Sequence, residues 1–257
     1  MSKSVLDFLK GKNVFVFDTE TTGLPLGSPS GWGSYWDYRM NDKYDSSRIV
    51  SIAWASIKNF DRENIDNNSN NSNSNNSNSN NSNNSNISHH IRYPEGFDSI
   101  PTTHIHGISL EEALKNGTPF GYILSIYGLA DALLNADYIV AHNVKFDYNI
   151  LMNELHRIVT TNEPIIPISL SIREKANLCL EHIKNLYDTK CVICTGILST
   201  EICKMEFPSK NTYLGKKKNY KMPKLCELYK YYYGKDFENA HSADGDVKAL
   251  LDCLKMM

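Results

Sequence analysis

Val14-Phe15-Val16-Phe17-Asp18-Thr19-Glu20-Thr21-Thr22-Gly23-Leu24 is the stretch of sequence that decides the fold. Its apolar first half is typical of a strand that is buried on both faces of a sheet. Asp18 and Glu20 follow two residues apart, so their side chains point to the same side of the strand. We expect both at the carboxyl end of a central strand, where open α/β sheets bind their ligands. Either they hold a divalent cation between them, or they are solvated turn residues.

The composition sets the class of protein. The chain has 257 residues, of which 41% are hydrophobic, and its formal net charge is -2. No global basic field points to nucleic acid, although an enzyme that meets phosphates through bound cations would not need one. No apolar run approaches the roughly 20 residues that span a bilayer, and residues 1–10 lack a signal-peptide core. With six scattered cysteines, we expect an intracellular protein of the cytoplasm or nucleus, neither secreted nor membrane-bound.

Strand and helix patterns alternate along the chain, which predicts an α/β domain over residues 11–257. Further strands are expected at 48–57, 90–93, 138–141 and 191–194, and helices at 120–135, 144–158, 172–185, 225–233 and 243–255. Asn67 to Asn86 is almost entirely Asn and Ser. Such a segment buries too little apolar surface to order itself, so we expect a disordered insertion over residues 64–88, within a β-hairpin.

Two of the expected helices carry acids on their apolar side. Asp147 precedes Leu151 by four residues, and Asp246 precedes Leu250 by four, so each faces inward with the apolar stripe of its helix. One such acid has a plain explanation in the helix dipole, which favours negative charge near a helix start. Together with Asp18 and Glu20 there are four acids in such positions, and a shared metal-binding cluster accounts better for the set.

Three ordered motifs now carry a resemblance to a known family. They are Phe17-Asp18-Thr19-Glu20-Thr21-Thr22-Gly23-Leu24, Ile139-Val140-Ala141-His142-Asn143-Val144-Lys145-Phe146-Asp147 and His241-Ser242-Ala243-Asp244-Gly245-Asp246. The chain resembles the DEDDh 3′-5′ exonucleases, which include the epsilon proofreading subunit of bacterial replicases and ribonuclease T. Ile105-His106-Gly107-Ile108 resembles a further loop of that family. The resemblance spans about residues 13 to 255, interrupted by the Asn/Ser tract.

The resemblance implies a ribonuclease H-like fold, with a mixed five-stranded sheet flanked by helices. It also implies a hydrolase that removes nucleotides from the 3′ end of single-stranded nucleic acid, which we expect to be DNA. Two Mg²⁺ or Mn²⁺ ions would be held by four acids, with His241 as the general base. The four ligands implied are Asp18, Glu20, Asp147 and Asp246. The terminal nucleotide would be contacted by Thr21, Gly23, Leu24, His106, Asn143 and Phe146.

The implied chemistry suits these residue types. Two divalent ions can clamp the attacking and leaving oxygens of a phosphoryl displacement. Histidine exchanges protons near neutral pH, so His241 is suited to take the proton of the attacking water. The alternatives are an RNA-trimming exoribonuclease of the ribonuclease T kind and a non-catalytic nucleic-acid-binding module on the same fold. The sequence carries no polymerase domain, so proofreading would require a polymerase or another replication or repair protein as a partner.

Other features allow two interpretations each. The aromatics of the loop from Gly23 to Asp45 can stack on bases or fix the loop to the body. Cys191 and Cys194 with Cys203 and His182 suggest a zinc site only weakly, since no second CxxC pair is present, and buried free thiols are the alternative. The lysines from Lys216 to Lys224 can guide a phosphate backbone or form a solvated loop. Asp244 we interpret as a helix-start acid, and the Asn/Ser tract as either an interaction segment or an inert insertion.

Deleting the tract tests the last choice. Replacing residues 67–86 by a short Gly/Ser linker should change the melting temperature by less than about 2 °C and leave any nuclease activity unchanged. The reason is that loop-closure entropy depends only logarithmically on loop length. Differential scanning fluorimetry and an activity assay on the two proteins measure this. A large loss of either property would show that the tract has a role.

Overall fold

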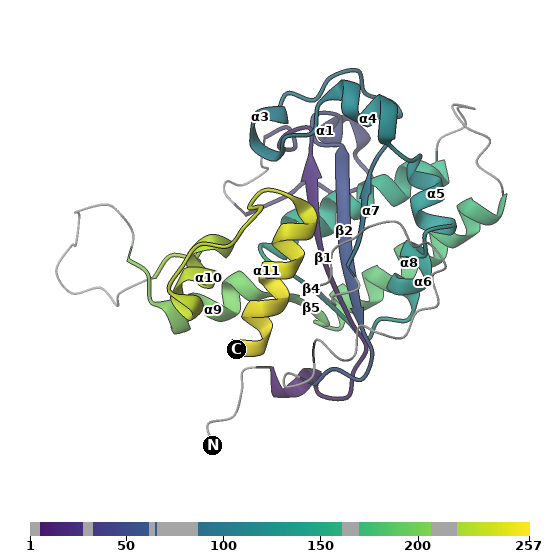
Figure 1. Cartoon of the computed structure of the whole chain (residues 1–257). Coiled ribbons are helices and arrows are strands. Elements are labelled where there is room, and N and C mark those ends of the chain that lie inside the picture. Colours follow the sequence, from purple (N-terminus) through teal and green to yellow (C-terminus); the bar gives the residue numbers. More distant parts are fainter. Residues whose placement is uncertain (1–5, 28–32, 62–64, 66–86, 161–169, 207–219) are drawn as a thin grey trace, which may run out of the picture.

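A central mixed sheet organises the chain in the computed structural model, which describes residues 6–27, 33–61, 65, 87–160, 170–206 and 220–257. The sheet has five strands in the order β3-β2-β1-β4-β5. They are β1 (Val14–Thr21), β2 (Ile49–Ile57), β3 (Ser88–Ile91), β4 (Tyr138–Ala141) and β5 (Val192–Cys194). Strands β1, β2 and β3 pair antiparallel, whereas β4 and β5 run parallel to β1. The predicted mixed five-stranded sheet is therefore confirmed (Figure 1).

The central strand β1 is longer than its neighbour β4. The parallel pairing of these two strands covers Val14 to Val16 on β1 and ends there. The antiparallel pairing with β2 continues to Thr21, with a register shift between Glu20 and Thr21. The second half of β1, which carries Asp18 and Glu20, therefore has a strand on one side only. The edge of β1 that faces β4 is unpaired beyond Val16, and the segment that follows β4 in the chain can contact it there.

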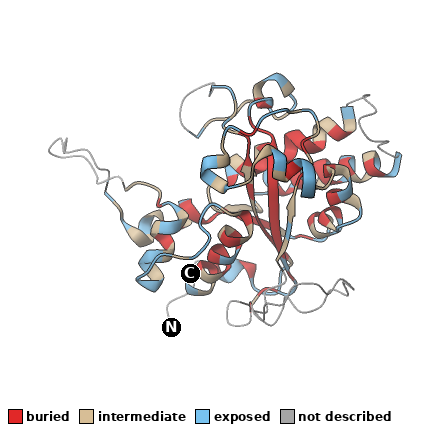
Figure 2. Cartoon of the chain, turned by 45° about the horizontal axis from the view of Figure 1, so that its top comes forward, coloured by how far each residue is buried: buried red, intermediate tan, exposed pale blue. Residues whose placement is uncertain are grey.

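Helices cover both faces of the sheet, because alternate residues of β1 enter two different cores. Phe15 and Phe17 pack in the core beneath α5 (Phe120–Ser125), α6 (Leu129–Leu134), α7 (Val144–Thr160) and α8 (Leu170–Asp188). Val14 and Val16 pack in the other core, with η1 (Asp7–Leu9), α9 (Thr195–Cys203), α10 (Leu225–Tyr233) and α11 (Ala243–Met256). Figure 2 shows the strands and the inner helix faces as buried. Asp18 and Glu20 share the alternation of Val14 and Val16, and so point to the α11 side.

Most predicted elements are present, with some corrections. The helical pattern over 120–135 is two helices, α5 and α6, because Gly128 interrupts it with a φ of 85°. Strand β3 begins at Ser88, two residues before the expected start, and α9 was not expected at all. The sequence also did not reveal the short α1 (Asn41–Tyr44) and α3 (Thr103–His106). Ser109 caps α4 (Leu110–Asn116), since its Oγ accepts the Glu112 amide at 3.1 Å.

The ends of the Asn/Ser insertion belong to the folded domain. Ile65 is buried in the α11-side core, and Ser88 pairs with Trp54 in the sheet. The predicted insertion, residues 64–88, therefore includes two positions that are part of the fold. Residues 66–86 lie outside the described residues. Among the helices that are described, none is long and apolar enough to cross a membrane.

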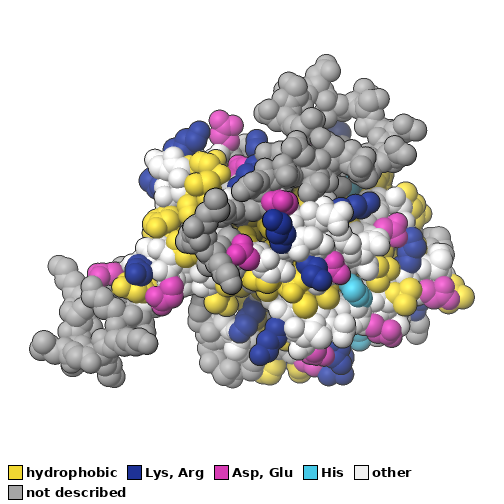
Figure 3. Space-filling model, turned by 90° about the horizontal axis from the view of Figure 1, so that it is seen from below, with side chains coloured by type: hydrophobic (Ala, Val, Ile, Leu, Met, Phe, Trp, Pro, Cys, Tyr) yellow, Lys and Arg dark blue, Asp and Glu magenta, His cyan; other side chains and the backbone are white. Residues whose placement is uncertain are grey.

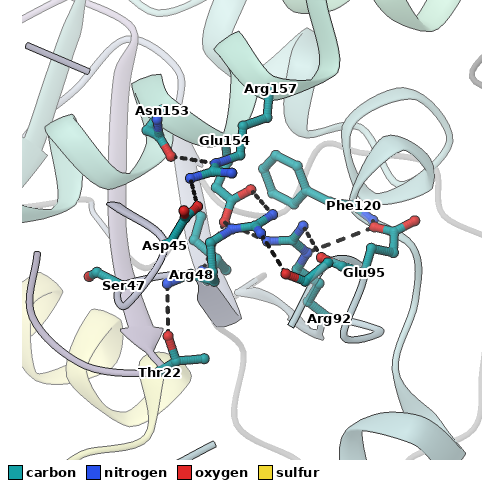
Figure 4. Close-up of polar contacts among 12 residues, drawn as sticks. Thr22, Asp45, Ser47, Arg48, Arg92, Glu95, Phe120, Asn153, Glu154 and Arg157 are labelled. Carbon is teal, nitrogen blue, oxygen red and sulfur yellow. Dashed lines mark hydrogen bonds and ion pairs between the residues drawn. The ribbon is translucent and has the colours of Figure 1, made fainter. Parts of the chain in front are cut away.

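A buried ion network fixes α7 to the sheet near the open half of β1. Glu154 of α7 accepts Arg48 Nε at 2.8 Å and Arg92 Nη1 at 2.6 Å, and also the Ile49 amide at 3.1 Å (Figure 4). The Arg48 amide donates in turn to Thr22 Oγ1 at 2.9 Å, just beyond the end of β1. One carboxylate thus connects α7, the start of β2, the end of β3 and the chain leaving β1.

The charges of this network compensate one another. The side chains of Glu154, Arg48 and Arg92 are 2%, 7% and 4% exposed, so none is solvated. Burial alone would raise the pKa of Glu154, but the two guanidinium groups outweigh it and hold the pKa well below its ordinary value. Arg92 also lies over the rings of Phe97 and Phe120, at 5.5 and 5.3 Å from their centroids. Removing the Glu154 carboxylate would leave Arg48 without its ion-pair partner and Arg92 with only the more distant Glu95, at 3.8 Å.

Glu154→Gln should therefore lower the free energy of unfolding by about 3–5 kcal/mol, because it keeps the shape and removes the charge. Urea denaturation monitored by circular dichroism measures the change. Glu111→Gln is a matched control, since Glu111 is exposed on α4, and should stay within about 0.5 kcal/mol. Equal stability of the two variants would contradict the assigned role of the network.

Candidate metal centre

Three carboxylates meet at the open half of β1. Asp18 and Glu20 of β1 and Asp246 of α11 each offer an oxygen, and these oxygens lie within 4.8 Å of one another. Asp246 reaches them because α11 covers the face to which Asp18 and Glu20 point. Hard carboxylate oxygens at this spacing fit a hard divalent cation. Among the described residues, this is the one group of His, Cys, Asp and Glu side chains arranged for a metal ion.

Asp147 reaches the same place from the other side. Its Oδ1 accepts the Thr19 backbone amide at 3.1 Å and Thr19 Oγ1 at 2.7 Å. The amide would be unpaired without it, because β4 ends before it reaches Thr19. Asp147 is 3% exposed and lies outside the three-acid group, although its charge acts on both Asp18 and Glu20. All four predicted acids therefore lie at one place, three in close contact and the fourth beside them.

The electrostatics of the cluster favour a bound cation. Burial, followed by the charges of Asp246 and Asp147, raises the pKa of Glu20 to about 8. Burial also raises the pKa of Asp147 and of Asp246 to about 7, and that of Asp18 well above its ordinary value. No ion pair between described residues involves any of the four. Their compensating charge must come from protons or from a metal ion.

His241 lies at the edge of the cluster, on the turn that leads into α11. It is exposed and has a φ of 66°. Its backbone is hydrogen-bonded to the Asp246 carboxylate, which acts to lower the pKa of that acid against the effect of burial. The backbone of His241 is thus fixed to a residue of the cluster, while its imidazole side chain is exposed to solvent.

Residues just after β1 form a tight turn that exposes one apolar side chain. Thr21 Oγ1 donates to the Gly23 carbonyl at 2.7 Å, and Ser47 Oγ donates to the same carbonyl at 2.6 Å. A Cβ on Gly23 would lie 2.9 Å from the Ser46 carbonyl oxygen, so a larger residue would force the backbone apart. Leu24 follows and is 70% exposed. Leu24 therefore presents an apolar side chain to solvent shortly after the strand that carries Asp18 and Glu20.

His106 of α3 is held by hydrogen bonds at both ring nitrogens. The Ile108 amide donates to Nδ1 at 3.2 Å, and Thr102 Oγ1 lies 3.0 Å from Nε2. Thr102 Oγ1 donates its own proton to the Thr21 carbonyl at 2.5 Å, so it must accept from the ring. The network therefore assigns a neutral imidazole with its proton on Nε2. His106 can meet a nucleotide through its ring surface but has no ring nitrogen left to donate.

Asn143 lies in the turn between β4 and α7, and Phe146 lies in the first turn of α7. Asn143 has a φ of 62°, a conformation that asparagine tolerates better than most residues. Its side chain is hydrogen-bonded to Tyr35, from the loop before α1. Phe146 is half-buried, with its ring centroid 6.4 Å from that of Tyr35. Tyr35 thus contacts two residues that were predicted to bind the terminal nucleotide, Asn143 and Phe146. Tyr35 itself was not among the residues predicted from the sequence.

The weaker sequence features are absent from the metal centre. Cys191, Cys194 and Cys203 are free cysteines, and His182 Nε2 is 2.9 Å from the Ala136 carbonyl oxygen. Residues 207–219, with the first lysines of the predicted basic loop, lie outside the described residues. Asp244 lies in the first turn of α11, as expected of a helix-start acid, and its Oδ1 lies 3.4 Å from His89 Nδ1. Figure 3 views the end of the sheet where β1 begins, and basic and acidic side chains are interspersed over its described surface.

No protein-family model and no curated protein matches this chain. Solved structures do match it. One is the zinc-bound form of E. coli exonuclease I in complex with single-stranded DNA, with 15% identity and a TM-score of 0.51, covering 96% of this chain and 40% of that chain. Another is product-bound exonuclease I, with 12% identity, a TM-score of 0.50, and 95% and 42% coverage. The chain spans about two fifths of the exonuclease I chains it matches.

These similarities establish the fold. It is the ribonuclease H-like α/β fold seen in exonuclease I, as the sequence resemblance implied. The acid cluster lies at the carboxyl-terminal half of the central strand of this fold. The identity is too low for a similar shape to carry an activity from one protein to another.

The raised pKa values predict how pH acts on metal binding. A folded-state pKa above the unfolded value means that the folded state binds more protons, so without metal the stability contributed by Glu20, Asp147 and Asp246 is lost as pH rises toward about 8. Because a metal competes with those protons, Mn²⁺ should bind at least about tenfold more tightly at pH 8 than at pH 6. Isothermal titration calorimetry at the two pH values measures this difference.

A melting series provides the control. The increase in melting temperature with Mn²⁺ should grow from pH 6 to pH 8 and should be lost in Asp246→Asn. Binding that is independent of pH, or an increase that survives in Asp246→Asn, would place the metal elsewhere.

Proposed function

We propose that the protein is a metal-dependent 3′-5′ exonuclease of the DEDDh kind, which hydrolyses phosphodiester bonds from the 3′ end of single-stranded DNA. The observation that carries the proposal is the convergence of four acids at the open half of β1, of which Asp147 is buried and the other three are half-buried, with a solvent-exposed histidine on the turn before α11. The fold shared with exonuclease I, which has been solved with single-stranded DNA, supports it. The three sequence motifs lie at this one place.

The residues suggest a division of roles. Asp18, Glu20 and Asp246 would hold one divalent ion, Mg²⁺ or Mn²⁺, and Asp147 would contribute to a second. Such ions, when bound, neutralise phosphate charge and make a water molecule more acidic. Thr19 fixes the Asp147 carboxylate by two hydrogen bonds, so this ligand does not need to reorganise.

His241 would accept the proton of the attacking water and release it to solvent, to which it is exposed. The other neighbours of the cluster would orient the 3′ end. Leu24 offers an exposed apolar surface to the terminal base, and His106 offers its ring surface. Thr21, Gly23, Asn143 and Phe146 complete the proposed contacts. Orientation of this kind brings the scissile bond into line with the attacking water.

Degradation of a 5′-labelled single-stranded DNA oligonucleotide tests the proposal. With Mg²⁺ or Mn²⁺ we expect a ladder that shortens from the 3′ end, and no products with chelator. Asp18→Asn should abolish the ladder, and His241→Ala should lower kcat by about 10²–10⁴-fold. Asp252→Asn, a paired acid farther along α11, is the matched control and should keep wild-type activity.

The same assay with the matching RNA distinguishes the substrates. Faster cleavage of DNA supports the proposal, whereas faster cleavage of RNA would favour the exoribonuclease alternative. No cleavage of either by folded protein would favour a binding module, and internal cuts would contradict exonuclease action.

A further inference from the structure

A cavity of about 450 Å³ lies beside the metal centre, between the loop before α1, the first two turns of α7 and the end of α8. Five of its ten lining residues are aromatic, and the others include Lys145, Asn149 and Asp37, whose carboxylate is paired with Arg39 at 2.6 Å. The residues that matter here are Tyr35, Tyr38, Lys145, Tyr148, Asn149 and Tyr187. Neither Leu24 nor His106 lines it, so it is separate from the proposed contacts of the terminal nucleotide.

The aromatics of the loop before α1 have two different uses. Trp36 Nε1 donates to the Leu26 carbonyl at 2.8 Å, and Tyr44, which is fully buried, donates its hydroxyl proton to the Trp36 carbonyl at 2.5 Å. Tyr38 packs against the core, and its carbonyl accepts Asn153 Nδ2 at 2.6 Å. These residues fix the loop to the body, which was one of the two interpretations from sequence.

Tyr35 is placed differently. It is hydrogen-bonded to the Asn143 side chain and faces Phe146, and it is close enough to Asp147 to respond to its charge. Tyr35 therefore lines the cavity and also contacts two residues that flank the start of α7, the helix that carries Asp147. A strand that leaves the metal centre past Phe146 would meet this ring next.

The far wall of the cavity offers a platform for stacking. The rings of Tyr148 and Tyr187 are stacked, with centroids 4.5 Å apart, and Tyr187 is 44% exposed. Lys145 is exposed at the same cavity and has no ion-pair partner among the described residues. Aromatic rings bind the faces of nucleobases, and an ammonium group binds phosphate. The volume is within the range of small-ligand sites and suits a single nucleotide.

We propose that this cavity is a subsite for the penultimate nucleotide of the single strand, whose base stacks against Tyr35 and the Tyr148–Tyr187 pair while Lys145 binds its phosphate. The subsite rests on the proposed function, since it extends the same substrate by one nucleotide. It would let the protein sense whether a stackable base precedes the 3′ end.

Equilibrium binding without catalysis tests the subsite. Fluorescence anisotropy with a 5′-fluorescein dT8 oligonucleotide, in chelator and about 50 mM salt, is compared with the same oligonucleotide carrying an abasic residue at the penultimate position. For the wild-type protein we expect the abasic residue to weaken binding by about fivefold to a hundredfold. Tyr187→Ala should weaken binding of the intact oligonucleotide to a similar extent and show no further loss with the abasic one.

Controls separate the stacking role from folding. Tyr187→Phe should behave as wild type, because stacking needs the ring and not the hydroxyl. Tyr231→Ala is the matched control, since Tyr231 is exposed on α10, and should keep the full abasic penalty. Lys145→Ala should reduce the slope of the logarithm of the binding constant against the logarithm of salt concentration by about one, the change expected for the loss of one phosphate contact.

Three outcomes would overturn the subsite. They are an equal abasic penalty in wild type and Tyr187→Ala, a penalty that depends only on the terminal position, or no measurable binding. The cleavage assay is read separately. If the protein cleaves DNA but Tyr187→Ala keeps the wild-type abasic penalty, the subsite is rejected and the exonuclease is kept. If the abasic penalty is lost in Tyr187→Ala but the protein does not cleave DNA, the subsite is kept and the catalysis is rejected.

Discussion

The structure around the metal centre depends on a difference in strand length. Strand β1 continues beyond the end of β4, so its second half has an unpaired edge in the interior of the protein. A buried amide without a partner is costly, and Asp147 satisfies the one at Thr19 with a carboxylate instead of another strand. The same gap that requires this acid lets α7 and α11 bring Asp147 and Asp246 to Asp18 and Glu20. One unmet backbone hydrogen bond thus explains why a charged group is buried at this point of the sheet.

Helix α7 shows how differently two buried acids can be treated. Asp147 and Glu154 lie two turns apart and are 3% and 1% exposed. Two arginines within the protein compensate the charge of Glu154, and the pKa of this acid falls well below its ordinary value. Asp147 has no such partner among the described residues, and its pKa rises to about 7. The contrast separates a structural acid, whose counter-charge is built in, from an acid whose counter-charge must be supplied from outside the chain.

The sequence was most informative where periodicity and chemistry agreed. The apolar run of β1 and the one-sided stripes of α7 and α11 placed the four acids correctly in the fold, because inward acids conflict with an apolar face. The rule that found Asp147 applies equally to Glu154, which follows Ile150 by four residues, yet the buried network was missed. The role of Thr19 was not predictable, because it depends on where β4 ends. Helix α9 was missed since its apolar residues form no single stripe, and Gly128 splits a pattern that read as one helix.

The position of the Asn/Ser tract within the β2–β3 hairpin has a practical consequence. Strand β2 ends at Ile57, opposite Val14 at the start of β1, whereas Glu20 is six residues along that strand. At about 3.3 Å per residue the chain leaves the sheet roughly 13 Å along the strand from Asp18 and roughly 20 Å from Glu20. An affinity tag or a fluorescent domain inserted there, between two paired strands, would lie at the end of the sheet remote from the candidate metal centre. The hairpin is therefore a natural attachment point for immobilising the protein with its metal centre facing solution.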